Sequence, residues 1–303
     1  MRFLLCLRRL VFMSGVIALV VSVEALGQVS AGIRVAGSDL LKGRCAAVLQ
    51  KSAAKIPGGL ELTLDGSLMA EKYLRLGRVD AALLVIAHGQ QAKVPEIASG
   101  EWVALPIGFQ SAVLVVNQLN RLEQMDFEMI AGIYGEFQVT DVRHWSKVEG
   151  SGLEMPVFAF MARSADGLSV PLFRSSVLRG GEFRRETAFR NSSSEVEAEV
   201  SANINAIGCL SMPPVQGRVR VLALAREKGA SAYLPTPENL YNGDYLLAVP
   251  AYLVFPVRNR ARLDMLLPVL FGADMAQALT ESNFTPAPKN IRENYIRGLD
   301  KKK

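Results

Sequence analysis

Short apolar runs alternate with amphipathic stretches along the first third of the chain. A buried strand is typically a short continuous apolar run, whereas a surface helix repeats its apolar residues at every third or fourth position. These patterns predict strands at Ile33–Ala36, Leu60–Leu64 and Val79–Ile86, with helices at Leu40–Lys55 and Leu68–Leu76. The order strand, helix, strand, helix, strand is typical of a parallel sheet with helices on both faces.

The same alternation continues through the rest of the chain, so the predicted fold class is α/β. Further strands are predicted at Ser111–Val116, Pro156–Met161, Ala206–Ser211, Val219–Leu224 and Tyr245–Phe255. Further helices are predicted at Glu123–Tyr134, Val170–Leu178, Glu195–Asn203, Leu263–Phe271 and Asp274–Ser282. The charged tail from Asn290 is expected to be a solvated helix or a frayed end.

Two segments are candidates for connections between one sheet unit and another. Ala112–Asn117 would leave the first unit, and Leu246–Val254 would return to it. The chain would then have a discontinuous first lobe (residues 28–112 and 248–303) and a continuous second lobe (residues 113–247). Ligand sites in open α/β sheets lie at the carboxyl ends of the strands, where the helices begin.

The N-terminus has the pattern of a secretory signal peptide covering residues 1–27. Three arginines among the first nine residues precede the apolar run Leu10–Val23, and the small residues Ala25 and Gly27 follow it. The alternative is a membrane anchor, but this run is shorter than the ~20 residues that a spanning helix needs. We therefore expect cleavage after Gly27 and export to the periplasm, without a lipid anchor, since no cysteine lies at the cut.

Composition and charge are those of a globular protein that could bind a small anion. Half of the 303 residues are hydrophobic and 21% are charged. Removal of residues 1–27 takes away three basic residues and Glu24, so the formal charge falls from +5 to +3. That charge is too mild to indicate nucleic-acid binding. Cys45 and Cys209 could pair in an oxidising compartment, but their apolar surroundings favour two separate buried thiols.

Three loops share one design, in which a strand is followed by a glycine-containing loop and a helix start. They are Ala36–Asp39, Leu64–Ser67 and Arg163–Ser169. The first turn of a helix exposes unpaired N–H groups, glycine lets a ligand approach the backbone, and an arginine fork matches an oxyanion. The alternative is that the serines of these loops only cap their helices. The candidate ligand-binding residues are Ser38, Asp39, Gly66, Ser67, Arg163, Gly167 and Ser169.

Several segments, in their order and spacing, resemble the phosphate-binding-type periplasmic proteins of ABC importers. They are IRVAGSDLL (Ile33–Leu41), DGSLMAEKYLRLGRVDAAL (Asp65–Leu83), MIAGIYGEF (Met129–Phe137) with HWSKV (His144–Val148), AIGCL (Ala206–Leu210), YLLAVPAYLVFP (Tyr245–Pro256) and FTPAP (Phe284–Pro288).

This resemblance implies a two-lobed type 2 periplasmic-binding-protein fold. Each lobe would be a mixed, mainly parallel sheet flanked by helices, and two hinge crossings would join the lobes. The implied ligand is a small oxyanion, phosphate in the first place, passed to an ABC permease in the inner membrane. We expect a monomer without cofactor, metal or nucleic acid.

Carried over by position, the resemblance places Ser38 and Asp39 in the first contact loop, Ser67 in the second, and Arg163, Gly167 and Ser169 in the second lobe. Three departures stand out. Asp39 replaces a threonine, Gly167-Leu168-Ser169 replaces Ser-Gly-Thr, and Leu84-Val85 replaces a serine pair. As a contact, Asp39 would accept the proton of hydrogen phosphate and reject sulfate. Otherwise it is an acid favoured in the first turn of a helix.

Two other functions stay open. The lost hydroxyls suggest a diverged relative that acts as a sensor or interaction protein and binds another ligand or none. A phosphate-ester hydrolase is the more remote alternative. His88 and His144 have no ligand-spaced partner, and no nucleophile elbow, P-loop or H-E-x-x-H motif is present. The basic clusters Arg179–Arg185 and Lys301–Lys303 are interpreted as solvated charge. We therefore do not expect an enzyme.

Overall fold

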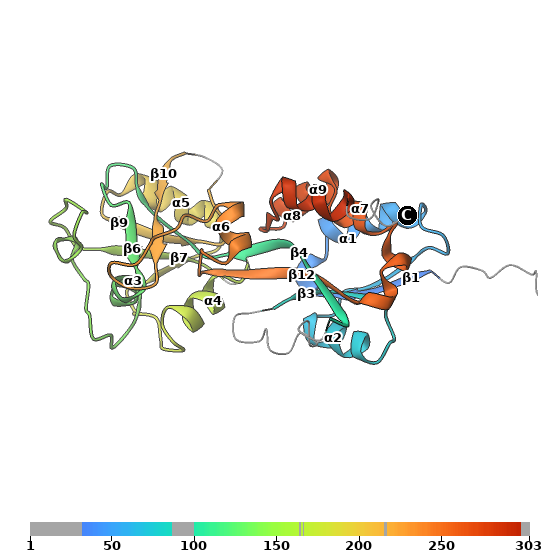
Figure 1. The fold of residues 1–303 in the computed structure, drawn as a ribbon. Coiled ribbons are helices and arrows are strands. Elements are labelled where there is room, and N and C mark those ends of the chain that lie inside the picture. The colour runs from blue at the N-terminus through green and yellow to red at the C-terminus, as the bar shows by residue number, and fades with distance from the viewer. Residues whose placement is uncertain (1–31, 87–99, 164, 166, 215–216, 298–303) are drawn as a thin grey trace, which may run out of the picture.

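The computed structural model describes residues 32–86, 100–163, 165, 167–214 and 217–297. The predicted signal peptide, His88 and the C-terminal lysines Lys301–Lys303 lie outside these residues. The chain folds into two lobes that lie side by side and are joined by long strands (Figure 1). Within the described ranges, no helix combines the length and the apolar character needed to cross a bilayer.

The first lobe is built on a six-stranded mixed sheet with the order β13-β4-β12-β3-β1-β2. Its strands are β1 (Ile33–Gly37), β2 (Leu60–Thr63), β3 (Ala81–Val85), β4 (Trp102–Ser111), β12 (Ala248–Pro256) and β13 (Thr285–Pro286). β1 runs parallel to β2 and β3, whereas β12 runs antiparallel to both β3 and β4.

Helices cover both faces of this sheet. They are α1 (Arg44–Ala53), α2 (Ser67–Arg75), α7 (Leu267–Leu270), α8 (Ala273–Thr280) and α9 (Lys289–Arg297). Alternation along β3 divides the core, because Leu83 packs with α1, α7 and α8 while Leu84 packs with α2. A strand buried on both faces needs a continuous apolar sequence, and this requirement explains the run Ala81–Val85.

The second lobe is built on a five-stranded mixed sheet with the order β10-β5-β9-β7-β8. Its strands are β5 (Val113–Asn117), β7 (Phe158–Ala162), β8 (Ala188–Arg190), β9 (Ala206–Leu210) and β10 (Val219–Val221), and a separate pair is formed by β6 (Gln124–Asp126) and β11 (Ala223–Ala225). The helices are α3 (Phe127–Tyr134), α4 (Ser169–Ser176), α5 (Ser193–Ala202) and α6 (Pro237–Asn242).

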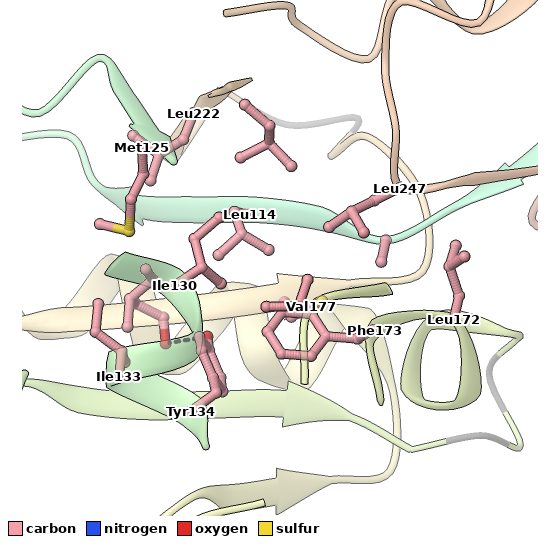
Figure 2. Packing of buried hydrophobic residues seen from close by; sticks show 14 of the residues in the cluster. Leu114, Met125, Ile130, Ile133, Tyr134, Leu172, Phe173, Val177, Leu222 and Leu247 are labelled. Carbon is pink, nitrogen blue, oxygen red and sulfur yellow. Dashed lines mark hydrogen bonds between the residues drawn. The ribbon is translucent and has the colours of Figure 1, made fainter. Parts of the chain in front are cut away.

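Large side chains fill the core of the second lobe between α3, α4 and the sheet. Figure 2 shows Tyr134 of α3 and Phe173 of α4 beside Leu114 of β5. The Tyr134 hydroxyl donates to the carbonyl oxygens of Phe160 (3.1 Å) and Ile207 (3.3 Å). These bonds satisfy a polar group that would otherwise be costly to bury, and they fix α3 against β7 and β9.

The two crossings between the lobes are hydrogen-bonded to each other. The amide of Ala112 donates to the carbonyl oxygen of Leu247 (2.9 Å), and the Tyr245 hydroxyl donates to the carbonyl oxygen of Ala112 (2.8 Å). All three residues are buried. A further bond links the lobes through the tyrosine hydroxyls of α6 and α9, Tyr241 and Tyr295 (3.1 Å). The hinge is therefore a bonded pair of strands.

The sequence patterns located most elements, with differences of a few residues at their ends. The helix predicted over Leu40–Lys55 is instead a short 3-10 turn at Asp39–Leu41 followed by α1, because Gly43 between them has φ +71°. The strand predicted at Val219–Leu224 divides into β10 and β11, which belong to different sheets. The helix predicted at Leu263–Phe271 shortens to α7 after a 3-10 turn at Ala261–Leu263.

The sequence patterns missed almost all of β4, because the predicted strand Ser111–Val116 begins only at the last residue of β4. Its sequence WVALPIGFQS contains Pro106 and Gly108, which disfavour a strand in isolation. Tertiary pairing with β12 along its whole length overrides that local preference. β12 also tolerates Pro250, whose carbonyl oxygen accepts from Ile86 (3.2 Å), and its register with β4 shifts at Ala251/Tyr252.

The prediction of two separate buried thiols is confirmed. Cys45 lies in the core of the first lobe and Cys209 in the core of the second, and both are free. Burial raises the pKa of each thiol. A buried protonated thiol is a poor nucleophile, so both cysteines act as packing residues.

The close packing of α5 on β9 at Gly208 leads to a prediction about stability. A Cβ at Gly208 would lie 2.6 Å from Val196 Cγ1 and 2.8 Å from Val200 Cγ2. Gly208→Ala should lower the free energy of unfolding by about 1–3 kcal/mol through overpacking, measured by urea denaturation. Gly217→Ala is the matched control, since a Cβ there meets nothing within 4 Å. Equal midpoints for the two variants would contradict this packing.

Candidate anion-binding site

The first glycine-containing corner lies at the carboxyl end of β1. The amide of Ser38 donates to the carbonyl oxygen of Leu83 (2.8 Å), and the Ser38 hydroxyl accepts from the amide of Leu40 (3.3 Å). Ser38 is therefore the N-cap of the following 3-10 turn and is buried. Asp39 begins that turn and is exposed. This position is compatible both with a ligand contact and with a first-turn acid that only stabilises the helix start.

The second corner is fixed to the end of β3. Gly66 has φ +114° and donates its amide to the carbonyl oxygen of Gly37 (3.1 Å), so the first two corners touch. The Ser67 hydroxyl donates to the carbonyl oxygen of Val85 (3.1 Å) and accepts from the amide of Val85 (3.0 Å). Ser67 thus anchors the start of α2 to β3, and this bond already uses its hydroxyl proton.

The third corner lies in the second lobe, between the end of β7 and the start of α4. Gly167 has φ +152°, and Ser169 is the first residue of α4. The buried Ser169 hydroxyl lies 3.1 Å from the Ser211 hydroxyl and 3.5 Å from the carbonyl oxygen of Ala162. Arg163 donates its amide to the carbonyl oxygen of Arg190 (2.9 Å) and has an exposed side chain.

Two buried polar residues at this corner were missed by the sequence patterns. Gln110 accepts through its amide oxygen from the amide of Leu168 (3.0 Å). A Cβ at Gly167 would lie 3.2 Å from Ser211 Cβ, which is a tight contact, and the φ of +152° is strained for other residues, so this position favours glycine. Ser211 could have been found, because it is the polar residue that ends the predicted strand Ala206–Ser211. Gln110 gave no such signal, because β4 was not predicted.

The corners of the two lobes are connected through the hinge strands. Val85, to which Ser67 is bonded, lies opposite Ala251 of β12, and Val249 of β12 lies opposite Gln110 of β4. Since neighbouring strands are ~4.8 Å apart, β3 and β4 lie about 10 Å apart across β12. Gln110 then bonds to the residue before α4. The helix starts of both lobes are thus held around the same strands (Figure 1).

The start of α4 is suited to an anion. The first amides of a helix have no partner within the helix and lie at the positive end of its dipole. In α4 the first two amides belong to Ser169 and Val170, since Pro171 has none to donate.

In the first lobe, the end of β3 offers no hydroxyl donors to an anion. Leu84 is buried against α2, and Val85 packs on the cores of both lobes. Both residues serve packing.

No group of three or more His, Cys, Asp or Glu side chains within the described ranges could hold a metal ion.

No family model matches the chain. In sequence, it is 23% identical to the phosphate-binding protein PstS of Pseudomonas aeruginosa over 206 residues, which are 65% of this chain and 64% of that protein. It is also 23% identical to the protein SphX of Synechococcus elongatus over 192 residues, 62% of this chain and 56% of SphX. The alignments thus span less than two thirds of these relatives.

Solved structures show the same fold. A possible phosphate binding protein from Planctomyces limnophilus superposes with a TM-score of 0.63 at 19% identity, over 88% of this chain and 97% of that one. PstS from Borrelia burgdorferi superposes with a TM-score of 0.66 at 13% identity, over 84% of this chain and 98% of that one. The chain is a distant homologue of the PstS phosphate-binding proteins. The predicted two-lobed fold with mixed sheets and two hinge crossings is confirmed. The expectation that each sheet is mainly parallel is wrong, because the hinge strands β4, β5 and β12 pair antiparallel with their neighbours.

The bond from Leu168 to Gln110 generates a prediction. Gln110→Leu keeps a similar volume but leaves the partly buried amide of Leu168 without its acceptor, at a cost of about 1–3 kcal/mol in the free energy of unfolding. Urea denaturation measures this cost. Gln277→Leu, at an exposed position of α8, is the control and should change stability by less than about 0.5 kcal/mol. Equal losses for the two variants would argue against the bond.

Proposed function

We propose that this chain is an exported solute-binding protein that captures phosphate between its lobes and delivers it to an ABC importer. The proposal rests on the homology to PstS proteins together with three glycine–serine corners, from both lobes, at the carboxyl ends of strands around the hinge. We propose residues 28–112 and 248–303 as one lobe and residues 113–247 as the other. The mature protein would act as a periplasmic monomer without catalytic activity.

The proposed donors have distinct roles. The amides at the start of α4 and the guanidinium of Arg163 would supply charge-assisted hydrogen bonds from the second lobe. From the first lobe, the Ser38 hydroxyl, whose oxygen accepts from Leu40, would turn its proton to the oxyanion from Oδ1 of Asp39, to which it donates over a long contact of 3.5 Å. Gly66 and Gly167 would let the oxyanion approach the backbone closely. Closure of the lobes would exclude water and strengthen these bonds.

Ser67 would contribute through position more than through its hydroxyl. That hydroxyl already bonds to both backbone groups of Val85. Ser67 would therefore hold the start of α2 in place and present its amide to the ligand.

Arg163 carries the clearest binding prediction. Arg163→Ala should weaken phosphate binding about 10- to 150-fold, the loss expected for a charge-assisted hydrogen bond in a closed cleft. Isothermal titration calorimetry at fixed ionic strength measures this loss. Arg185→Ala is the matched control, because it removes the same charge from an exposed residue before the amino end of β8. Equal affinities for the two variants would show that Arg163 has another role.

Asp39 is tested by anion selectivity. If its carboxylate accepts the proton of hydrogen phosphate, Asp39→Asn should raise the affinity for sulfate relative to phosphate by about tenfold. Competition titration gives that ratio. Asp65→Asn, at the exposed neighbouring loop, controls for the general effect of removing an acid. An unchanged ratio would leave Asp39 with the role of a first-turn acid.

A diverged receptor is the second candidate function. The observation that favours it is the loss of donors at the end of β3, where Leu84 and Val85 are packing residues and the Ser67 hydroxyl is already bonded. A flat calorimetric response of the mature protein to phosphate, sulfate and molybdate would rule out the importer function and support this alternative. Binding of phosphate with a 1:1 stoichiometry would exclude it.

A further inference from the structure

The fold of the third corner explains only half of the Gln110 side chain. Gln110 lies near the end of β4 and is 4% exposed. Its amide oxygen accepts from the amide of Leu168 (3.0 Å). A backbone N–H group can only donate, so the carboxamide must turn its oxygen toward Leu168 and its NH2 group away from it. The bond to Leu168 therefore accounts for the oxygen and leaves the nitrogen without a structural role.

This nitrogen, Nε2 of Gln110, has no hydrogen-bond partner among the described residues. It is also not one of the fully enclosed polar atoms that lack a partner, so it remains reachable from solvent although the residue is buried. Buried polar groups are normally paired, and an apolar side chain of similar size would fill this space without an unpaired donor. A nearly buried NH2 group that is open on one side is suited to a ligand.

The unpaired nitrogen lies beside Gly167 at the start of α4. A Cβ built on Gly167 would lie 3.7 Å from Nε2 of Gln110. Because glycine has no side chain, the backbone at this position stays open toward the nitrogen. Two residues later α4 begins at Ser169, where the first amides of this eight-residue helix lie at the positive end of its dipole. The free donor of Gln110 and the start of α4 thus meet at one place.

The hydroxyl groups of this corner are less available than the Gln110 amide. Oγ of Ser169 lies 3.1 Å from Oγ of Ser211, so the bond between them uses one of the two protons. The carbonyl oxygen of Ala162 lies 3.5 Å from Oγ of Ser169, and both serines are 1% exposed. In the described part of this corner, Gln110 is thus the neutral side chain whose donors the protein leaves unused.

The position of Gln110 is fixed from both lobes. Its backbone pairs with Val249 of β12 in the sheet of the first lobe, and its side chain bonds to Leu168 of the second lobe. The side chain is therefore ordered before a ligand arrives. A preorganised donor of this kind loses little conformational entropy on binding.

We propose that Gln110 is a ligand-binding residue of the anion site, and that its Nε2 donates to an ionised oxygen of the bound oxyanion. This inference rests on the proposed function and adds to it a donor from the hinge strand β4. A neutral NH2 group donates most strongly to an oxygen that carries negative charge and no proton. Phosphate and sulfate both present such oxygens, so Gln110 favours tetrahedral oxyanions as a class and leaves the choice between them to other residues.

The NH2 signals of Gln110 test this contact directly. In a ¹H–¹⁵N NMR spectrum of the labelled mature protein, they are assigned by their loss in Gln110→Glu. Saturating phosphate should move one of the two proton signals downfield, whereas the NH2 signals of Gln50, exposed on α1, should stay in place. Phosphate binding without movement of the Gln110 signals would overturn this inference and leave the proposed function intact. Absence of any phosphate binding would overturn the proposed function and this inference with it.

Two variants separate the donor from the bond to Leu168. Gln110→Glu keeps an oxygen that accepts from Leu168 but replaces the donor, so phosphate affinity should fall at least about tenfold while the melting temperature stays close to that of the wild type. Gln110→Met removes the donor without adding charge. Its phosphate affinity should fall by a similar factor, and its melting temperature should fall as well. Calorimetry and thermal denaturation followed by circular dichroism give these values.

Gln124→Glu is the control for the added charge, because Gln124 is exposed at the start of β6 in the same lobe. Its phosphate affinity should stay within about twofold of the wild type, since exposed charges farther away than about 10 Å are screened. Wild-type phosphate affinity in Gln110→Met would show that the amide gives nothing to the ligand and would refute the contact.

Discussion

The structure depends on the pairing of β4 with β12. These strands are far apart in the sequence, yet they pair antiparallel from Trp102–Pro256 at one end to Ser111–Ala248 at the other. The pairing joins β4 to the other strands of the first-lobe sheet. It also brings the two crossings together, where Ala112 bonds to Leu247. A paired double crossing bends more readily than it stretches or slides, since sliding would break its ladder of hydrogen bonds. The pairing thereby restricts how the lobes can move.

The same pairing explains the position of the candidate anion site. Gln110, the penultimate residue of β4, reaches into the second lobe and accepts from the amide of Leu168. On the other side of β12, β3 holds the start of α2 through Ser67. Helix starts of both lobes are therefore positioned by the hinge strands themselves. A small change at the hinge therefore moves the helix starts of the two lobes relative to each other.

The chain keeps the two-lobed fold although it is only 23% identical to the PstS protein of Pseudomonas aeruginosa. Strands buried on both faces require apolar residues but tolerate exchange among them, so the fold survives extensive substitution. The end of β3 is a different case, because Leu84 and Val85 pack well at positions where the family resemblance implies hydroxyls.

The sequence by itself determined the α/β class, most strands and the location of the three glycine corners, because hydrophobic period and glycine placement are local properties. It also favoured two separate buried thiols for Cys45 and Cys209, as the structure confirms. Only the tertiary structure decided that WVALPIGFQS is a strand, that Ser67 is bonded to β3, and that Gln110 and Ser211 complete the third corner. The physical reason is that each of these depends on a partner distant in the sequence: β12 for β4, Val85 for Ser67, and the start of α4 for Gln110 and Ser211. No local pattern encodes such a partner.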